Sequence, residues 1–261
     1  MKLFKELLEW ILSWRCNSSP ARRVETEIEA TKIAEEAAKE GDKKYIICNN
    51  KPVVIDWEKV ITHKDVEGLA LPENCYRKVK NERVPTMFVA HWDVCLSSKS
   101  CFNILKNRGI SVHFCIDNDG TIYQLMDCND IGFHAGNWKV NTKSIGVEIS
   151  NAYYLRYQST YKLKGFDDRP VLRESHVHGR TLDPHLGFYP IQLKAFKALA
   201  SALHESYNIP LEAPTTTTVD KEVARSTYCG IVNHYHITKR KIDCAGSDWN
   251  AILEDEKSLD V

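Results

Sequence analysis

The chain has 261 residues, 43% of them hydrophobic, which is enough for one large domain with a substantial core. Its 35 basic and 35 acidic residues cancel, and this balance argues against a nucleic-acid-binding protein. No apolar run approaches the length of a membrane-spanning helix. The nine cysteines form no Cys-x-x-Cys pair, which argues against a four-cysteine zinc site and a thioredoxin-type motif.

The first 15 residues predict an amphipathic helix. Apolar residues recur at helical spacing in KLFKELLEWILSWR, and three basic residues give the segment a basic edge. Two glutamates interrupt the run and no cleavage site follows, so we expect synthesis in the cytoplasm without a signal peptide. Two interpretations stay open: peripheral membrane contact through residues 1–15, or a helix docked on the domain's own surface.

A change in composition near residue 43 predicts a domain boundary. Residues 24–40 are rich in alanine and glutamate and predict a second helix. Beyond them, two short apolar runs flank Asn49-Asn50, a pattern typical of a hairpin. We therefore expect a helical N-terminal segment over residues 1–43 and the main domain over residues 44–261.

Predicted strands and helices alternate through the main domain. The Asn118-Asp119-Gly120 sequence is a strong hairpin signal, whereas residues 152–188 show little periodicity and predict a long irregular insertion. The pattern predicts an α/β fold, a single domain with a central mixed β-sheet flanked by helices and preceded by the helical N-terminal segment. Strands are expected over residues 86–91, 112–116, 121–126 and 144–150, and helices over residues 97–107, 190–207 and 248–254.

Candidate metal ligands occur at two distant places in the chain. His91 ends the apolar run TMFVAHWD, and His234 opens the second group in GIVNHYHITKRKIDCAG. The same stretch offers Asp243 and Cys244, either of which zinc accepts. Two close donors and one distant donor fit a catalytic zinc site with a fourth position left for water. His236 would share a face with His234 if this segment were extended.

Glu148 is a further candidate, because it is the one acid within the apolar run SIGVEIS. A carboxylate in such a run is usually paired or functional. A carboxylate in such a position can serve as an acid–base group in catalysis. The alternative is a carboxylate paired with a neighbouring base.

Five pieces of the sequence occur in the order typical of one family. They are FVAHWD, SVHFCIDNDGTIYQL, GFHAGN, SIGVEIS and NHYHIT followed by DCAG, within residues 84–250. On these pieces the chain resembles the zinc-dependent N-acetylmuramoyl-L-alanine amidases of the type-2 amidase and peptidoglycan-recognition-protein superfamily. The N-terminal 43 residues and the insertion fall outside the resemblance.

The resemblance implies a set of site residues. It implies His91, His234 and Cys244 as ligands of one zinc ion, because the family's third ligand stands two residues before a glycine. Asp243 is the alternative, since the family often places a lysine two residues before the ligand and Lys241 has that spacing. It also implies Glu148 as the catalytic acid–base group.

Other residues receive less specific roles from the same resemblance. Lys241 would stabilise the negative charge of the reacting oxygen or be a surface lysine. His134 would line the substrate groove, or would be a loop histidine that forms hydrogen bonds with the backbone. His236 would support the zinc ligands. Cys95 and Cys101 stand where animal relatives carry a disulfide. The insertion's His176, His178, Asp183 and His185 would belong to a substrate-contacting loop or a second metal site.

The expected activity is zinc-dependent hydrolysis of the amide bond between N-acetylmuramic acid and L-alanine in peptidoglycan. A phage endolysin that acts on the cell wall is the first expectation, and a muropeptide-recycling amidase is the second. An alternative from another class is a recognition module that binds peptidoglycan without cutting it. The retained third ligand and Glu148 favour the enzyme.

Overall fold

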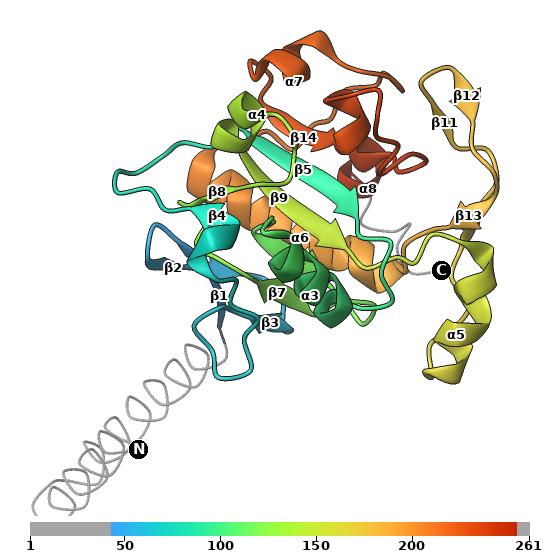
Figure 1. Ribbon diagram of the computed structural model, residues 1–261, viewed down its shortest axis with the longest axis horizontal. Helices are drawn as coiled ribbons and strands as arrows, with labels where there is room; N and C mark the ends of the chain where they lie inside the picture. The colour runs from blue at the N-terminus through green and yellow to red at the C-terminus, as the bar shows by residue number, and fades with distance from the viewer. Residues whose placement is uncertain (1–42, 255–261) are drawn as a thin grey trace, which may run out of the picture. The chain divides into compact units, whose positions relative to one another are not determined.

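The structure is a computed structural model that describes residues 43–254 (Figure 1). The described residues from Lys44 onward belong to one compact unit. The helices predicted within residues 1–40 lie outside the described residues and stay predictions. Among residues 43–254, no helix has both the length and the apolarity needed to cross a bilayer.

The described chain begins with the expected hairpin. β1 (Lys44–Cys48) pairs antiparallel with β2 (Lys51–Ile55). Asn49 and Asn50 form the turn with φ angles of 52° and 60°. Asparagine tolerates this left-handed conformation better than most residues, so the Asn-Asn pair fixes the two-residue turn.

A six-stranded mixed sheet forms the centre of the domain, as predicted (Figure 1). Neighbouring strands pair in parallel, except that β6 and β7 pair antiparallel through the predicted hairpin. In spatial order the strands are β14 (Gly230–Asn233), β5 (Met87–Trp92), β9 (Ser144–Ile149), β6 (Phe114–Ile116), β7 (Ile122–Gln124) and β3 (Val60–Ile61). A separate two-stranded ladder joins β4 (Tyr76–Arg77) to β8 (Ile131–Gly132).

Helices cover the two faces of this sheet. Figure 1 shows α6 (Pro190–Tyr207) behind the sheet and α3 (Ser98–Arg108) in front of it. The α3 bounds follow from its caps: the Ser97 hydroxyl accepts a hydrogen bond from the Ser100 N–H, and Gly109 ends the helix at φ 64°. The shorter helices are α4 (Trp138–Lys143), α7 (Lys221–Arg225) and α8 (Trp249–Glu254), and α8 contacts α6.

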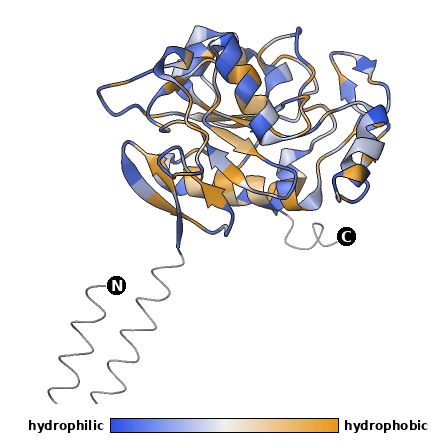
Figure 2. Ribbon diagram, turned by 60° about the horizontal axis from the view of Figure 1, so that its bottom comes forward, coloured by the Kyte–Doolittle hydropathy of each residue, from blue (hydrophilic) through white to orange (hydrophobic). Residues whose placement is uncertain are grey.

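Side-chain alternation along the strands separates an apolar face from a functional one. Phe88 and Ala90 of β5, like Val147 of β9, enter the main core, which also contains the buried face of α6. Because successive side chains of a strand point to opposite faces, His91 and Glu148 lie on the face away from α6. Figure 2 shows the apolar colour concentrated on the central strands.

The insertion at residues 152–188 is more ordered than its sequence predicts. It contains a small apolar cluster of its own around Tyr161 and Leu186, and the buried Arg169 ties it to the sheet. The Arg169 guanidinium donates to the carbonyls of Gly187 at 2.8 Å and Ser150 at 2.7 Å. Its elements are η2 (Leu155–Tyr157), α5 (Gln158–Leu163), β10 (Val171–Leu172), β11 (His176–Val177), β12 (Arg180–Thr181) and β13 (His185–Leu186).

Candidate metal centre and active site

Three adjacent parallel strands bring the candidate residues to one edge of the sheet. In the register of β5 and β9, the backbone of His91 lies opposite that of Glu148. In β14 and β5, Asn233 pairs with Ala90, so His234 follows at the level of His91. The carboxyl ends of parallel strands share one edge, where sites in α/β proteins commonly form. Glu148 and His234, which follow His91 by 57 and 143 positions in the sequence, therefore lie beside it in the fold.

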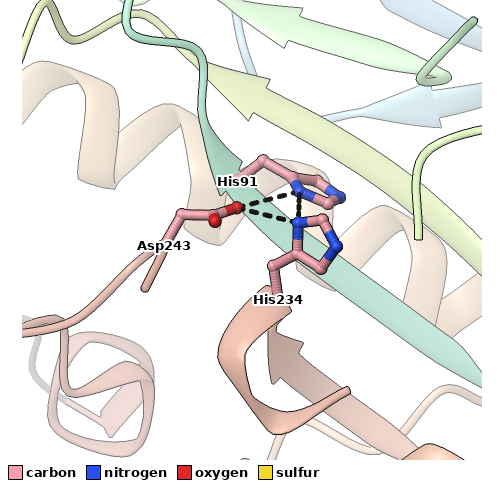
Figure 3. Close-up of side chains that lie close together, drawn as sticks. All are labelled: His91, His234 and Asp243. Carbon is pink, nitrogen blue, oxygen red and sulfur yellow. Dashed lines mark hydrogen bonds and ion pairs between the residues drawn. The ribbon is translucent and has the colours of Figure 1, made fainter. Parts of the chain in front are cut away.

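His91, His234 and Asp243 form a buried triangle of donor atoms (Figure 3). The Nδ1 atoms of the two histidines are 2.9 Å apart. The Asp243 Oδ2 atom lies 3.1 Å from Nδ1 of His91 and 3.0 Å from Nδ1 of His234. All three side chains converge on one point, from β5, the short helix η3 (His234–His236) and the following loop.

This triangle fits a zinc ion in spacing and in protonation. Ligand atoms bound about 2.0–2.1 Å from zinc in a tetrahedron lie about 3.3 Å apart, close to the separations of the three atoms. Burial, and then the charge of His234, lower the pKa of His91 to about 4, so its imidazole is neutral at pH 7. Burial alone would raise the pKa of Asp243, but hydrogen bonds from His234 and His91 hold it below its usual value. Neutral imidazoles and a carboxylate are the forms that bind metal.

The prediction of Cys244 as third ligand is corrected by this geometry. Cys244 is fully buried in the main apolar core, and its sulfur is not among the donor atoms grouped with the histidines. Adjacent side chains diverge in this segment, so Asp243 turns to the histidines and Cys244 turns away. The spacing of Lys241 two residues before Asp243 agrees with this geometry, and the glycine spacing does not.

Glu148 borders the same cavity as the three donor residues. The cavity has a volume of about 930 Å³ and its lining includes His91, His234, Asp243 and Glu148. The Oε2 atom of Glu148 is buried without a hydrogen-bond partner among the described residues. Burial, followed by the negative charges of Asp93 and Asp243, raises the pKa of Glu148 well above 4.5. An unpaired carboxyl of this kind favours the acid–base role over the paired alternative.

Lys241 also lines the cavity. Its positive charge opposes the raised pKa of Glu148 and contributes to the lowered pKa of His91, which places it near both groups. The His178 ring of the insertion lies 2.8 Å from the Lys241 carbonyl and 3.1 Å from the Thr218 hydroxyl. The insertion therefore holds the loop that carries Lys241, a contact that its sequence did not indicate.

His134 lies at the cavity wall, and both of its ring nitrogens have partners inside the protein. Its Nδ1 is 3.0 Å from Nε2 of His91, and its Nε2 is 3.2 Å from the Ser144 hydroxyl. Burial, then the charge of His91, lower the pKa of His134 well below 6.5. Sequence reasoning missed Ser144, which stands at the start of the strand that carries Glu148.

His236 was expected to support the zinc ligands, but the structure places it away from them. The chain turns into η3 after Asn233, so His236 leaves the face of His234. The His236 Nε2 atom lies 2.9 Å from the Thr216 carbonyl, and its Nδ1 accepts from the Asn233 N–H. It therefore holds a neighbouring loop and does not contact the donor triangle.

Among residues 43–254, candidate metal donors form one other group of three. Asp93, Cys95 and Cys101 lie close together beside the cavity, and both cysteines are free thiols. The Asp93 carboxylate already accepts from two backbone N–H groups and the Ser150 hydroxyl. Within residues 43–254, the histidines of the insertion belong to no group of three metal donors.

Comparisons with known proteins identify the family of the chain. The family model described as N-acetylmuramoyl-L-alanine amidase matches residues 80–246. Over 101 residues, 36% of this chain, the sequence is 35% identical to a protein of Rickettsia conorii provisionally named as an N-acetylmuramoyl-L-alanine amidase. The match spans 38% of that relative's length.

Solved structures with a similar arrangement of elements include two endolysins. A mutant endolysin from Bacillus subtilis has a TM-score of 0.41 at 18% identity, over 69% of this chain and 88% of the other. The Ph2119 endolysin from a Thermus scotoductus bacteriophage has a TM-score of 0.41 at 15% identity, over 75% of this chain and 97% of the other.

Proposed function

Because the chain belongs to the N-acetylmuramoyl-L-alanine amidase family, we propose that it hydrolyses the amide bond between N-acetylmuramic acid and L-alanine in peptidoglycan. The observation that carries the proposal is the convergence of His91, His234 and Asp243 beside the unpaired carboxyl of Glu148. A recognition module that only binds would have no need of this combination.

In this proposal His91, His234 and Asp243 hold one zinc ion. When bound, zinc polarises a carbonyl group and lowers the pKa of a water molecule towards about 7. The two neutral imidazoles and one carboxylate leave the dication with a net positive charge. The buried position of the triangle keeps the three donors in a fixed arrangement.

Glu148 supplies the proton transfers of the reaction. Its unpaired Oε2 takes a proton from the attacking water as the oxygen bonds to the carbonyl carbon. It then returns that proton to the nitrogen of L-alanine as the carbon–nitrogen bond breaks. One carboxyl can serve in both steps, because it holds the proton between them.

Lys241 stabilises the negative charge that develops on the carbonyl oxygen. A cation held beside this oxygen stabilises the charge as it develops. The contact between His178 and the Lys241 carbonyl fixes the backbone of this residue. Its ammonium group is then presented from a held loop.

Mass spectrometry of a purified disaccharide–tetrapeptide after incubation with the zinc-loaded protein tests this function. We expect two products: a disaccharide with a free lactyl carboxylate and a peptide with a free L-alanine amine. Protein stripped of metal by a chelator should yield neither, and added zinc should restore both. Intact substrate with the zinc-loaded protein, or cleavage at a glycosidic bond, would refute the proposed activity.

We further propose that the polymeric cell wall is the natural substrate, as expected of an endolysin. The sequence resemblance to phage lysis enzymes supports this choice. Rates on intact sacculi and on soluble anhydro-muropeptides separate it from the recycling alternative. A strong preference for the soluble fragments would favour recycling.

A further inference from the structure

We propose that His134 is a positioning residue, which with Ser144 fixes the ring tautomer of His91 and so keeps the His91 Nδ1 lone pair available for the metal. The inference rests on the metal centre of the proposed function. It assigns to His134 a role different from the substrate contact expected from the sequence.

The contacts form a continuous row from the donor triangle to the sheet. His91 faces Asp243 and His234 with Nδ1 and faces His134 with Nε2. His134 continues the row from Nδ1 to Nε2, where it meets the Ser144 hydroxyl at 3.2 Å. Each ring therefore uses one nitrogen towards the metal centre and the other away from it.

Proton counting gives this row a direction. A neutral imidazole has one N–H donor and one acceptor nitrogen. If His91 Nδ1 is to bind metal, His91 must carry its proton on Nε2 and donate it to Nδ1 of His134. His134 must then carry its own proton on Nε2 and donate it to Ser144. The reverse direction would place a proton on His91 Nδ1 and block the metal.

The backbone around His134 is shaped to hold its ring in this place. A Cβ atom on Gly146 would lie 2.8 Å from the His134 ring, and one on Gly132 would lie 3.3 Å from it. Gly146 belongs to β9, so the ring packs flat against the strand that carries Glu148. A larger residue at position 146 would push the ring out of reach of His91.

The same contacts argue against a primary role in substrate binding. Both ring nitrogens of His134 already have partners at hydrogen-bond distance. A substrate group could bond to either nitrogen only by displacing His91 or Ser144. Groups that orient a metal-binding histidine typically contribute about 10- to 100-fold to metal affinity.

Zinc affinity, measured by competition with a chromogenic chelator, tests the inference without any peptidoglycan. His134→Leu keeps the size of the side chain and removes the acceptor, and it should weaken zinc binding about 10- to 100-fold. His134→Asn can place Oδ1 where Nδ1 stands, and it should recover most of the affinity. Equal affinity of both variants and wild type, with activity lost, would make His134 a substrate contact and overturn the inference.

A matched control is His185→Leu. His185 is another buried histidine near a serine hydroxyl, 3.4 Å from Ser175, and it is not among the grouped metal donors. This change should lower stability and leave zinc affinity within about twofold of wild type. A loss equal to that of His134→Leu would show a general packing effect and overturn the inference.

Nitrogen-15 NMR of wild-type protein gives a readout that needs no variant. In the zinc-loaded protein, the His134 ring should be the Nε2–H tautomer and the His91 ring should carry its proton on Nε2. A proton on Nδ1 of His134 would contradict the proposed direction of the row. Because neither assay uses substrate, failure of the hydrolysis test would leave these results interpretable.

Discussion

Glu148 carries the proton chemistry of the proposed reaction, and it is adjacent to the metal donors without being one of them. Glu148→Gln should keep about one zinc per chain and lose about 10²- to 10⁴-fold in kcat, the range typical of a general acid–base group. Activity on a soluble muropeptide and metal content of the same sample are the measurements. Loss of zinc would make Glu148 a ligand, and near-normal activity would remove it from the mechanism.

The raised pKa of Glu148 also predicts how the zinc-free protein responds to pH. A carboxyl whose pKa is raised by folding binds its proton more tightly in the folded state. This tighter proton binding stabilises the folded state below pH 4.5, the ordinary pKa of a glutamate side chain. The stabilisation is lost as the pH rises towards the pKa of Glu148 in the folded state. Glu148→Gln lacks this loss, so its melting temperature should exceed that of wild type at pH 7.

Calorimetry in a chelating buffer at pH 4 and pH 7 measures this effect. The advantage of the variant should be larger at pH 7 than at pH 4, because wild type loses the Glu148 contribution as the pH rises and the variant has no such group to ionise. An advantage of the same size at both values would mean that the Glu148 carboxyl is not perturbed.

The sequence was enough to propose His91, His234 and Glu148 as candidates, because each ends or interrupts an apolar strand. The structure places all three around one cavity. It could not decide between Asp243 and Cys244, which are adjacent and both acceptable to zinc. That choice depends on which side chain the turn after η3 directs at the histidines. The hydrogen-bond row from His91 through His134 to Ser144 could not be predicted either, because it depends on contacts between distant segments.

Among the elements, the strands of the sheet were the most predictable. Their apolar alternation places the main core on one face and the site on the other. The short helix η3 was not predicted, because its residues are compatible with a strand that continues past His234. The insertion was not predicted as ordered, because one buried arginine and several aromatic rings hold it together in place of a periodic apolar pattern.

Arg169 should therefore be the main anchor of the insertion. Arg169→Met would keep the length of the side chain and leave the carbonyls of Gly187 and Ser150 without these donors. Hydrogen bonds from a charged group are worth about 1.5–3 kcal/mol each, so loss of the two bonds should lower the free energy of unfolding by about 3–6 kcal/mol. Urea denaturation provides the measurement.

Arg173→Met is the control for this change, because Arg173 is an exposed arginine of the same insertion. It should alter the free energy of unfolding by less than about 0.5 kcal/mol. If the two variants were equally stable, the insertion would be held by contacts other than those of Arg169.

For the molecule as a whole, the N-terminal 15 residues raise the question of where the protein acts. The hypothesis to test for these residues is reversible membrane association through their Leu/Trp face and basic edge. In a co-sedimentation assay, the full chain should pellet with anionic liposomes, and a chain starting at Lys44 should stay in solution. Equal partitioning of the two would favour a helix docked on the domain surface.

The identity of the metal centre is tested most directly by zinc-edge X-ray absorption of the zinc-loaded, full-length protein. With His91, His234 and Asp243 as ligands, the spectrum should contain nitrogen and oxygen neighbours at about 2.0–2.2 Å. Cys244→Ser should leave both the spectrum and the zinc content unchanged, whereas Asp243→Ala should lose the metal. Sulfur scattering at about 2.3 Å in the wild-type spectrum would contradict the His/His/Asp centre.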